Sequence, residues 1–177
     1  MVYINLKLSV MNKTPSSVYT VRFTDCDPLG HLNNGRYIDY FLNAREDHLQ
    51  DNYQMNLKTF YLQGSSWVVS SHEITYLRPA DYTERIRIDS RLLHIAPDHL
   101  VVELRMTDEN ETHLKAMMWT RFVPINVKTG RRENHSESFM EFAKSVAVDE
   151  FDVTRGYKER LKEVLGQMKS LKQPVEG

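Results

Sequence analysis

Two aspartates, Asp25 and Asp27, lie two residues apart in the segment DCDPLGHLNN, which spans residues 25–34. Pro28 disfavours helical backbone angles at the residue before it, so the Asp27 carboxylate is expected to stay in a loop. Gly30 permits a tight turn with a positive φ. A carboxylate held in this way could act as a nucleophile or as a general base in the hydrolysis of a carbonyl compound.

The residues after this loop predict the start of a helix, because Asn33 or Asn34 can act as its N-cap. N–H groups in the first turn of a helix have no intrahelical partner, and the helix dipole adds partial positive charge there. A thioester carbonyl could therefore sit between Asp27 and oxyanion donors near Asn33, Asn34 and Gly35. Aspartate and asparagine are also the usual turn and capping residues at a strand-to-helix junction, so the residues alone leave both interpretations open.

The segments on either side of the loop predict the elements that would hold it. Residues 17–24 have the sequence SVYTVRFT, whose β-branched and aromatic side chains are typical of a strand. From about residue 34 to residue 50, apolar side chains recur at spacings of three and four, which predicts a helix packed on one face. This arrangement would present Asp27 on a loop, where a scaffold can offer side chains to a ligand.

The rest of the chain predicts a sheet followed by helices. Residues 1–10 alternate apolar and polar side chains and are expected to form a strand. Four further segments have the pattern of half-buried antiparallel strands: residues 67–77, 84–95, 99–106 and 112–123. A short helix is expected near residues 136–146, and an amphipathic helix begins near Tyr157. This order predicts an α+β fold in which one helix covers one face of an antiparallel sheet.

Composition narrows the possible partners and compartment. The 177 residues include 23 Lys and Arg against 24 Asp and Glu, so the net charge of −1 gives no general attraction to nucleic acid or to an anionic membrane. Cys26 is the single cysteine, which excludes an internal disulfide and favours the cytoplasm. No run of about 18 apolar residues could span a membrane. The seven histidines are scattered without metal-ligand spacing, and we expect neither a metal nor a cofactor.

The segment VRFTDCDPLGHLNNGRYIDYFLNARE, residues 21–46, resembles the start of hot-dog-fold thioesterases of the hydroxybenzoyl-CoA thioesterase and acyl-CoA thioester hydrolase type. The segment EITYLRPA, residues 73–80, is similar to the family's next strand and turn. The resemblance implies a hot-dog fold, an antiparallel sheet of five to six strands wrapped around one long central helix. It assigns residues 1–124 to the thioesterase domain. Residues 125–177 would then form a C-terminal extension with one or two helices, packed on the same domain or on a sister subunit.

The resemblance also implies roles for individual residues. Asp27 corresponds to the family's nucleophile or general base, and the backbone N–H at or near Asn34 corresponds to the group that polarises the thioester carbonyl. The segment HLNNGRY, residues 31–37, resembles acyl-ACP thioesterases, in which a histidine at the position of His31 assists the carboxylate. Those enzymes carry an asparagine two residues before that histidine, where this chain has Leu29, so their side-chain network does not transfer whole.

The expected substrate is an acyl-CoA or acyl-ACP thioester, hydrolysed by a homodimer or homotetramer with active sites at the subunit interface. In such an assembly Ser65 could approach Asp27 of a neighbouring subunit. Four aromatic residues could line an acyl tunnel or could simply belong to the core: Tyr37, Tyr40 and Phe41 of the helix and Trp67 of the strand after it. The residues expected to bind substrate are Gly30, Asn33, Tyr37, Ser65 and Arg78.

Two other functions remain open. A hot-dog protein could bind acyl-CoA without hydrolysing it. A hot-dog dehydratase would need a catalytic histidine paired with a carboxylate in other motifs, which the sequence lacks. Cys26 is a poor candidate for a nucleophile because Asp25 and Asp27 flank it, whereas a thiolate needs an electropositive setting.

Overall fold

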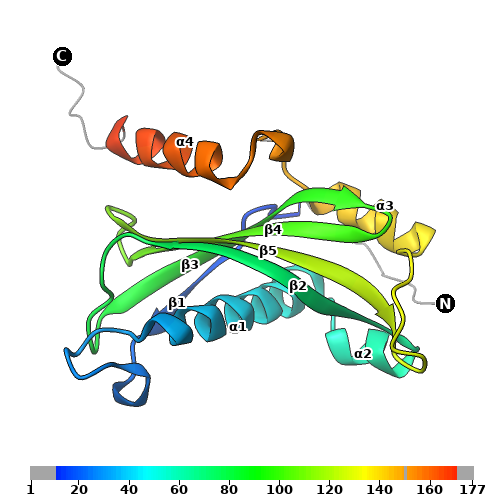
Figure 1. Cartoon of the computed structure of the whole chain (residues 1–177), viewed down its shortest axis with the longest axis horizontal. Helices are drawn as coiled ribbons and strands as arrows, with labels where there is room; N and C mark the ends of the chain where they lie inside the picture. Colours follow the sequence, from blue (N-terminus) through cyan, green and yellow to red (C-terminus); the bar gives the residue numbers. More distant parts are fainter. Residues whose placement is uncertain (1–10, 150, 171–177) are drawn as a thin grey trace.

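The computed structural model describes residues 11–149 and 151–170. The strand expected in residues 1–10 lies outside the described residues. Five antiparallel strands form one sheet in the order β1-β3-β4-β5-β2. Their bounds are β1 Ser16–Thr20, β2 Ser65–Tyr76, β3 Arg85–Ala96, β4 His99–Asp108 and β5 Leu114–Asn126. The sheet curves around the long helix α1, Asn34–Tyr53, and this confirms the predicted α+β, hot-dog arrangement (Figure 1).

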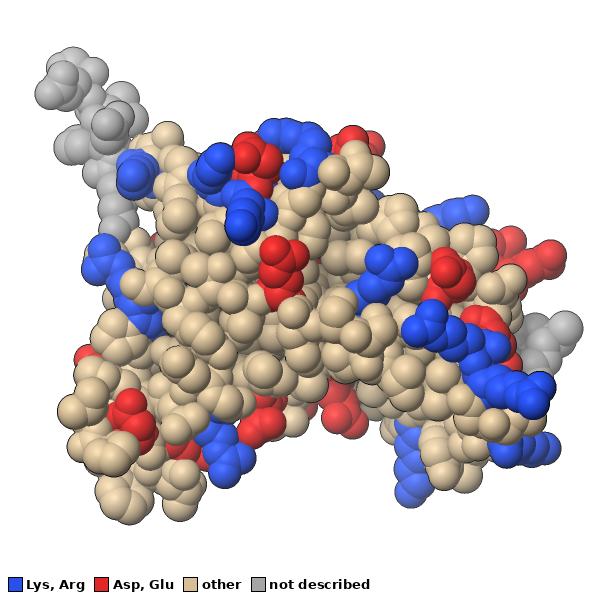
Figure 2. Space-filling view, in the orientation of Figure 1, with Lys and Arg blue, Asp and Glu red and all other residues tan. Residues whose placement is uncertain are grey.

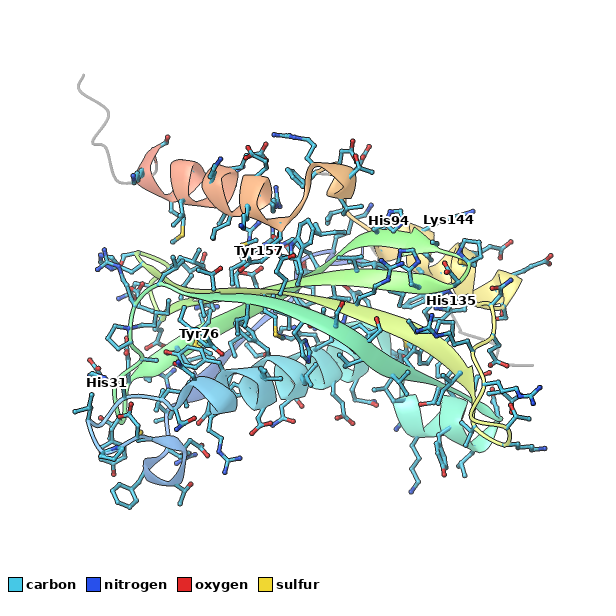
Figure 3. The ribbon with its side chains drawn as sticks, viewed as in Figure 1. His31, Tyr76, His94, His135, Lys144 and Tyr157 are labelled. Carbon is cyan, nitrogen blue, oxygen red and sulfur yellow. The ribbon has the colours of Figure 1, made fainter. Side chains whose placement is uncertain are left out.

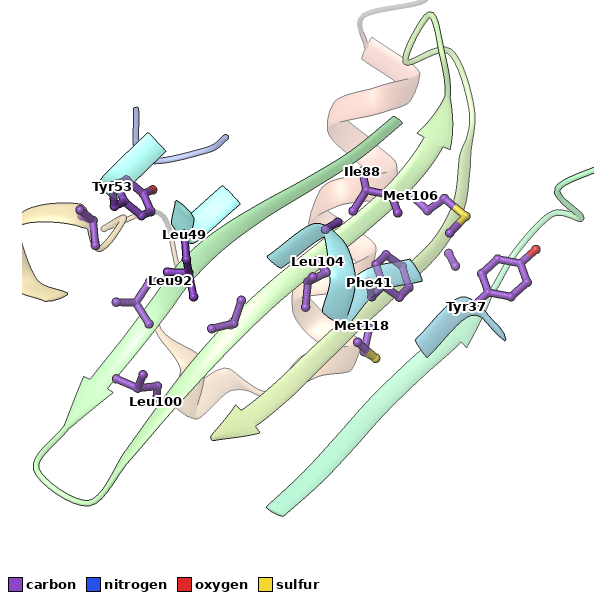
Figure 4. Packing of buried hydrophobic residues seen from close by; sticks show 14 of the residues in the cluster. Tyr37, Phe41, Leu49, Tyr53, Ile88, Leu92, Leu100, Leu104, Met106 and Met118 are labelled. Carbon is purple, nitrogen blue, oxygen red and sulfur yellow. The ribbon is translucent and has the colours of Figure 1, made fainter. Parts of the chain in front are cut away.

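Helix α1 lies on the concave face of the sheet because it carries one apolar stripe. Tyr37, Phe41 and Ala44 recur at spacings of four and three and are buried, and Leu49 continues the stripe. The facing strands supply the other half of the core, as Figure 4 shows for Phe41 beside Leu104 and Met118. Alternate residues of β3 and β4 therefore point toward the helix, in the manner of a sheet with one face on the core.

Two short helices lie at the end of the sheet away from the start of α1. Helix α2, Leu57–Leu62, lies on the α1 side, and helix α3, Glu137–Val146, packs Phe139 and Phe142 into the same core as α1. Ser136 caps α3 through a hydrogen bond from Phe139 N, 3.2 Å long. The sequence predicted α3 but not α2, because six residues are too few to display a helical period.

The first strand is shorter than expected. It ends at Thr20, and residues Phe23–Asp25 form a turn of 3-10 helix instead of extending the strand to residue 24. The predicted end of the strand was wrong, because the β-branched and aromatic residues that suggested a strand continue beyond Thr20. Val21 still forms a backbone hydrogen bond to the connection between β2 and β3: its N–H donates to Glu84 O at 3.0 Å.

The opposite face of the sheet is covered by helix α4, Tyr157–Ser170 (Figure 1). Tyr157 and Val164 of this helix pack with Trp119 of β5 in a second apolar cluster. Beneath the helix lies Glu103 of β4, a fully buried carboxylate that accepts hydrogen bonds from Arg160 Nε at 3.0 Å and Trp119 Nε1 at 3.0 Å. Arg105 also donates to it. A buried carboxylate with these partners anchors α4 to the sheet.

Charged groups of both signs are interspersed on the face shown in Figure 2, in keeping with the net charge of −1. Among the helices that the structure describes, none is long and apolar enough to cross a membrane. The division of the chain at residue 124 stays a proposal, since β5 continues to Asn126 before the chain reaches α3.

The Glu103 network predicts a large stability effect for a small change. Burial alone would raise the pKa of Glu103, but Arg105 and Arg160 outweigh it and hold that pKa below its ordinary value. Glu103→Gln should lower the free energy of unfolding by about 3–5 kcal/mol, because it leaves buried guanidinium groups without their carboxylate. Denaturant unfolding measures the loss. The control Glu159→Gln breaks the exposed Lys162–Glu159 pair and should cost at most about 0.5 kcal/mol; equal losses for both variants would contradict the assignment.

Candidate active site

The loop before α1 holds Asp27 in a fixed orientation. Asp27 Oδ1 accepts hydrogen bonds from Leu29 N at 2.9 Å and from His31 N at 3.1 Å. The Asp27 N–H donates to His31 O at 2.8 Å, and Gly30 N donates to Asp27 O at 3.0 Å. Gly30 has a φ of +79°, which closes the turn. One carboxylate oxygen is therefore fixed by backbone donors, while Oδ2 has no hydrogen-bond partner among the described residues.

The first turn of α1 leaves one backbone donor without an acceptor. Asn33 is the N-cap, and its Oδ1 accepts from Gly35 N at 3.0 Å while its carbonyl accepts from Arg36 N at 2.8 Å. Between these two, the N–H of Asn34 forms no hydrogen bond within the part of the chain that the structure describes. The side chain of Asn33 thus shapes the helix start, and the backbone of Asn34 is the group that could receive a negatively charged oxygen.

A pocket of about 250 Å³ lies between this loop, the start of α1 and the end of β2. It brings together most of the residues that the sequence singled out, while Gly30 and Asn33 shape the turn without lining it. Its lining residues are Asp27, His31, Leu32, Asn34, Tyr37, Tyr76, Leu77, Arg78 and Pro79.

Tyr76 is a pocket residue that the sequence analysis did not single out. Its hydroxyl donates to the Asn34 carbonyl at 2.9 Å, and its ring packs edge-on against Tyr37, with ring centroids 5.1 Å apart. Tyr37 is itself held by Ala80 N, which donates to its hydroxyl at 3.2 Å. Burial raises the pKa of both tyrosines, so both remain phenols at neutral pH. The available signal was the position of Tyr76 inside EITYLRPA, two residues before Arg78.

His31 lies on the loop at the edge of the molecule, near the start of α1 (Figure 3). Its imidazole is 39% exposed, and its Nε2 is 3.6 Å from Asp81 Oδ1. No hydrogen bond within the described residues joins the imidazole to the Asp27 carboxylate; the two residues are linked through their backbones and through the bond from His31 N.

Ser65 lies at the start of β2, at the opposite end of that strand from Tyr76. Its hydroxyl donates to Glu133 Oε1 at 2.7 Å. Beside it, Trp67 Nε1 donates to His135 Nε2 at 3.0 Å. Ser65 is therefore not part of the Asp27 pocket of its own chain.

Asp25 and Cys26 have supporting positions. Asp25 Oδ2 accepts from the Tyr40 hydroxyl at 2.9 Å, and its carbonyl accepts from Asn33 N at 2.9 Å, so Asp25 ties the loop to α1. Burial raises the pKa of the Cys26 thiol, and the charges of Asp25 and Asp27 raise it further. The thiol is thereby kept from forming the thiolate that a nucleophile would need.

An apolar cavity of about 240 Å³ lies along α1 on the same side of the sheet, toward α2 and α3. Leu42, Leu49, Trp67 and Phe122 are among its wall residues. Of the aromatic residues considered for an acyl tunnel, Trp67 lines this cavity, whereas Phe41 is fully buried in the core and Tyr40 is engaged with Asp25.

A family model described as the thioesterase-like superfamily matches residues 21–154. The long-chain acyl-CoA thioesterase FadM of Escherichia coli (strain K12) is 29% identical to this chain over 109 residues, which cover 62% of this chain and 81% of that protein. A crystal structure of YbaW, a probable thioesterase from Escherichia coli, has a TM-score of 0.65 and 25% identity, and the match covers 75% of this chain and 98% of that one. A DHNA-CoA thioesterase from Staphylococcus aureus shares the fold, with a TM-score of 0.68 at 14% identity over 87% of this chain and 94% of that one.

The positive φ of Gly30 can be tested by comparing two glycines. A Cβ would meet no atom within 4 Å at Gly30 or at Gly166 in α4, but only Gly30 has a positive φ. Gly30→Ala should therefore lower the free energy of unfolding by about 1–2 kcal/mol through backbone strain alone. Gly166→Ala should raise it by about 0.5–1 kcal/mol, because glycine disfavours a helix interior. Thermal and denaturant unfolding measure both values, and a stabilised Gly30→Ala would contradict the strained turn.

Proposed function

The chain belongs to the thioesterase-like superfamily, and on this premise we propose that it hydrolyses acyl-CoA thioesters in the pocket beside Asp27. The proposal depends on one observation: a carboxylate and the first turn of a helix line the same pocket, and each has one polar atom without a hydrogen-bond partner among the described residues. Asp27 supplies the first and Asn34 the second. Hydrolysis of a thioester needs a group that attacks or activates water and a group that stabilises the oxyanion, and no more.

In the proposed reaction the thioester carbonyl oxygen accepts a hydrogen bond from Asn34 N. Asp27 Oδ2 then either removes a proton from a water molecule that adds to the carbonyl carbon, or adds to that carbon itself. In the first route the tetrahedral oxyanion collapses, the C–S bond breaks, and the thiolate takes up the proton from Asp27. In the second route the C–S bond breaks to leave a mixed anhydride and a thiolate. Water then hydrolyses the anhydride to the free acid and protonated Asp27, which gives its proton to the thiolate. Both routes yield a free acid and a thiol.

Neighbouring side chains have roles in positioning under this proposal. Tyr76 fixes the Asn34 carbonyl and thereby the first turn of α1, and His31 assists from the rim of the pocket. Tyr37 forms part of the pocket wall. Arg78, which is exposed at the pocket, would pair with a phosphate of the carrier, since a guanidinium matches phosphate oxygens well.

Coenzyme A is the preferred carrier in this proposal because FadM, the relative with 29% identity, is named as a long-chain acyl-CoA thioesterase. An acyl-carrier protein would be the alternative carrier. The apolar cavity along α1 would hold the acyl chain, because most of its wall residues are apolar. The single cysteine fits action in the reducing cytoplasm.

The alternative function is non-catalytic binding of acyl-CoA, and substitution of Asp27 separates the two. Asp27→Asn should lower kcat by at least about a hundredfold while leaving the fold unchanged, because the amide can neither attack nor accept a proton. Release of free thiol from acyl-CoA, followed with a chromogenic disulfide, measures the rate, and circular dichroism checks the fold.

Asp98→Asn is the matched control, since Asp98 is an exposed aspartate in the turn between β3 and β4 and lies outside the pocket. It should hydrolyse acyl-CoA at the rate of the unsubstituted protein. Tight binding of acyl-CoA with no thiol release, unaffected by Asp27→Asn, would instead establish the binding function.

We also propose that the active unit is a homodimer joined through β2. This strand is at the edge of the described sheet, and its Val68 and Val69 side chains are exposed. An open edge strand with apolar side chains readily pairs with another copy. Antiparallel pairing about the middle of β2 would set Ser65 beside Tyr76 of the partner subunit, and so bring the Ser65 end of one chain to the Asp27 pocket of the other.

Val68→Lys tests this dimer, because a charge on an edge strand opposes pairing. The variant should sediment as a monomer and should lose at least about tenfold in kcat/KM, since each pocket would lack the wall supplied by its partner. Asn110→Lys, which adds the same charge in the exposed turn after β4, should remain a fully active dimer. A monomeric but fully active unsubstituted protein would refute the proposal.

A further inference from the structure

A buried arginine stands in the wall of the apolar cavity along α1. Arg45 is 7% exposed and lines the cavity together with leucines, phenylalanines and Trp67. An arginine is almost never buried without a partner of opposite charge. Removing its charge from water costs free energy on the order of several kcal/mol. The proposed hydrolysis at Asp27 does not use this residue.

The groups around Arg45 are polar but neutral. Its Nη1 donates to Ser90 Oγ at 3.2 Å, and its charge also lies near the Tyr53 hydroxyl. Burial lowers the pKa of Arg45, and Tyr53 offsets this only in part. Within residues 11–149 and 151–170, no carboxylate lies within ion-pair distance of the guanidinium.

His48 is the fourth member of this group, and it does not carry charge. Its Nδ1 is 2.8 Å from Ser90 Oγ, and the side chain is fully buried. Burial and the charge of Arg45 lower the pKa of His48 to about 4, so the imidazole is neutral at neutral pH. In the part of the chain that the structure describes, Arg45 therefore holds a positive charge beside an apolar cavity, with no carboxylate to offset it.

One other charged residue, Glu46, lines the cavity, but it does not form an ion pair with Arg45. Glu46 is exposed and forms no ion pair with Arg45 in the described part of the chain. Since Glu46 follows Arg45 directly on α1, its side chain leaves the helix about 100° away from that of Arg45. None of the described residues therefore supplies a carboxylate to Arg45, whereas a ligand in the cavity can supply one.

We propose that Arg45 binds a carboxylate at the far end of the acyl chain, so that the protein acts on thioesters of ω-carboxyacyl groups. The inference rests on the proposed thioesterase function and adds the chemistry of the substrate's second end. A guanidinium suits this role because its fork can bind both oxygens of a carboxylate. The apolar walls would hold the methylene chain between the two polar ends.

Distance along the helix sets the expected chain length. Arg45 follows Asn34 by eleven residues on α1, which corresponds to about 16 Å at the usual helical rise. An extended chain advances about 1.2 Å per bond, as the reach of an extended backbone implies. The preference is therefore expected to be greatest for acyl groups of about 10–14 carbons and absent for acyl groups of about four.

The experiment compares pairs of acyl-CoA substrates of equal length, one ending in a carboxylate and one in a methyl group, from 4 to 16 carbons. The unsubstituted protein should favour the carboxylate-ended member by about tenfold to a hundredfold in kcat/KM near 12 carbons, the range of a hydrogen-bonded charge pair. In Arg45→Met that ratio should fall to about one or below, and Arg45→Lys should restore part of it. A merely structural role for Arg45 would lower both members of each pair alike.

Arg155→Met is the matched control, because Arg155 is an exposed arginine that pairs with Glu163 of α4 and does not line the cavity. It should keep the ratio of the unsubstituted protein. If Arg45→Met does not fold, the unsubstituted protein alone still decides the question, through its substrate ratio and through competition by free acids. Dodecanedioic acid should then inhibit at least about tenfold more strongly than dodecanoic acid.

Equal kcat/KM values for both members at every length would overturn the inference about Arg45 and leave the thioesterase function standing, provided that Asp27→Asn still abolishes thiol release. Loss of the proposed function has a different signature, since thiol release would then be absent for every substrate or independent of Asp27.

Discussion

The burial of one stripe of α1 against the concave sheet is the contact on which the other features depend. Phe41 is fully buried in the middle of that stripe, and its neighbours one turn away are buried with it. Because the helix is held along its length, its first turn has a fixed position beside the loop that contains Asp27. The same contact leaves the adjoining side of the helix turned toward β2, where the apolar cavity lies. Site and cavity are thus two consequences of one packing interaction.

Helix α4 packs on the face of the sheet opposite α1. The carboxylate of Glu103 is buried under α4 and joined to Arg160 and Trp119, so α4 covers the outer face of the sheet around Glu103. Buried ion pairs add little net stability compared with apolar packing, but they are costly to break, and they therefore fix which face α4 covers. The curvature of the sheet around α1 is consequently supported on both sides.

The sequence predicted the parts of the fold and site that depend on local patterns. The period of α1 and the alternation of the strands located their elements to within a few residues, and Pro28 and Gly30 located the loop. It did not reveal α2, which is shorter than two full helical turns, or the end of β1, where a β-branched run continues into 3-10 turns. Nor did it reveal Tyr76 or Arg45, because what distinguishes them is a contact with a residue distant in sequence.

The hydrogen bond from the Tyr76 hydroxyl to the Asn34 carbonyl joins the last residue of an edge strand to the first residue of the central helix. A displacement of β2 along its own axis is thereby transmitted to the first turn of α1, where the free N–H lies. The edge of the sheet and the start of the helix are therefore linked through a single side chain. A second chain that paired along β2 would therefore act on the first turn of α1 through the Tyr76 side chain.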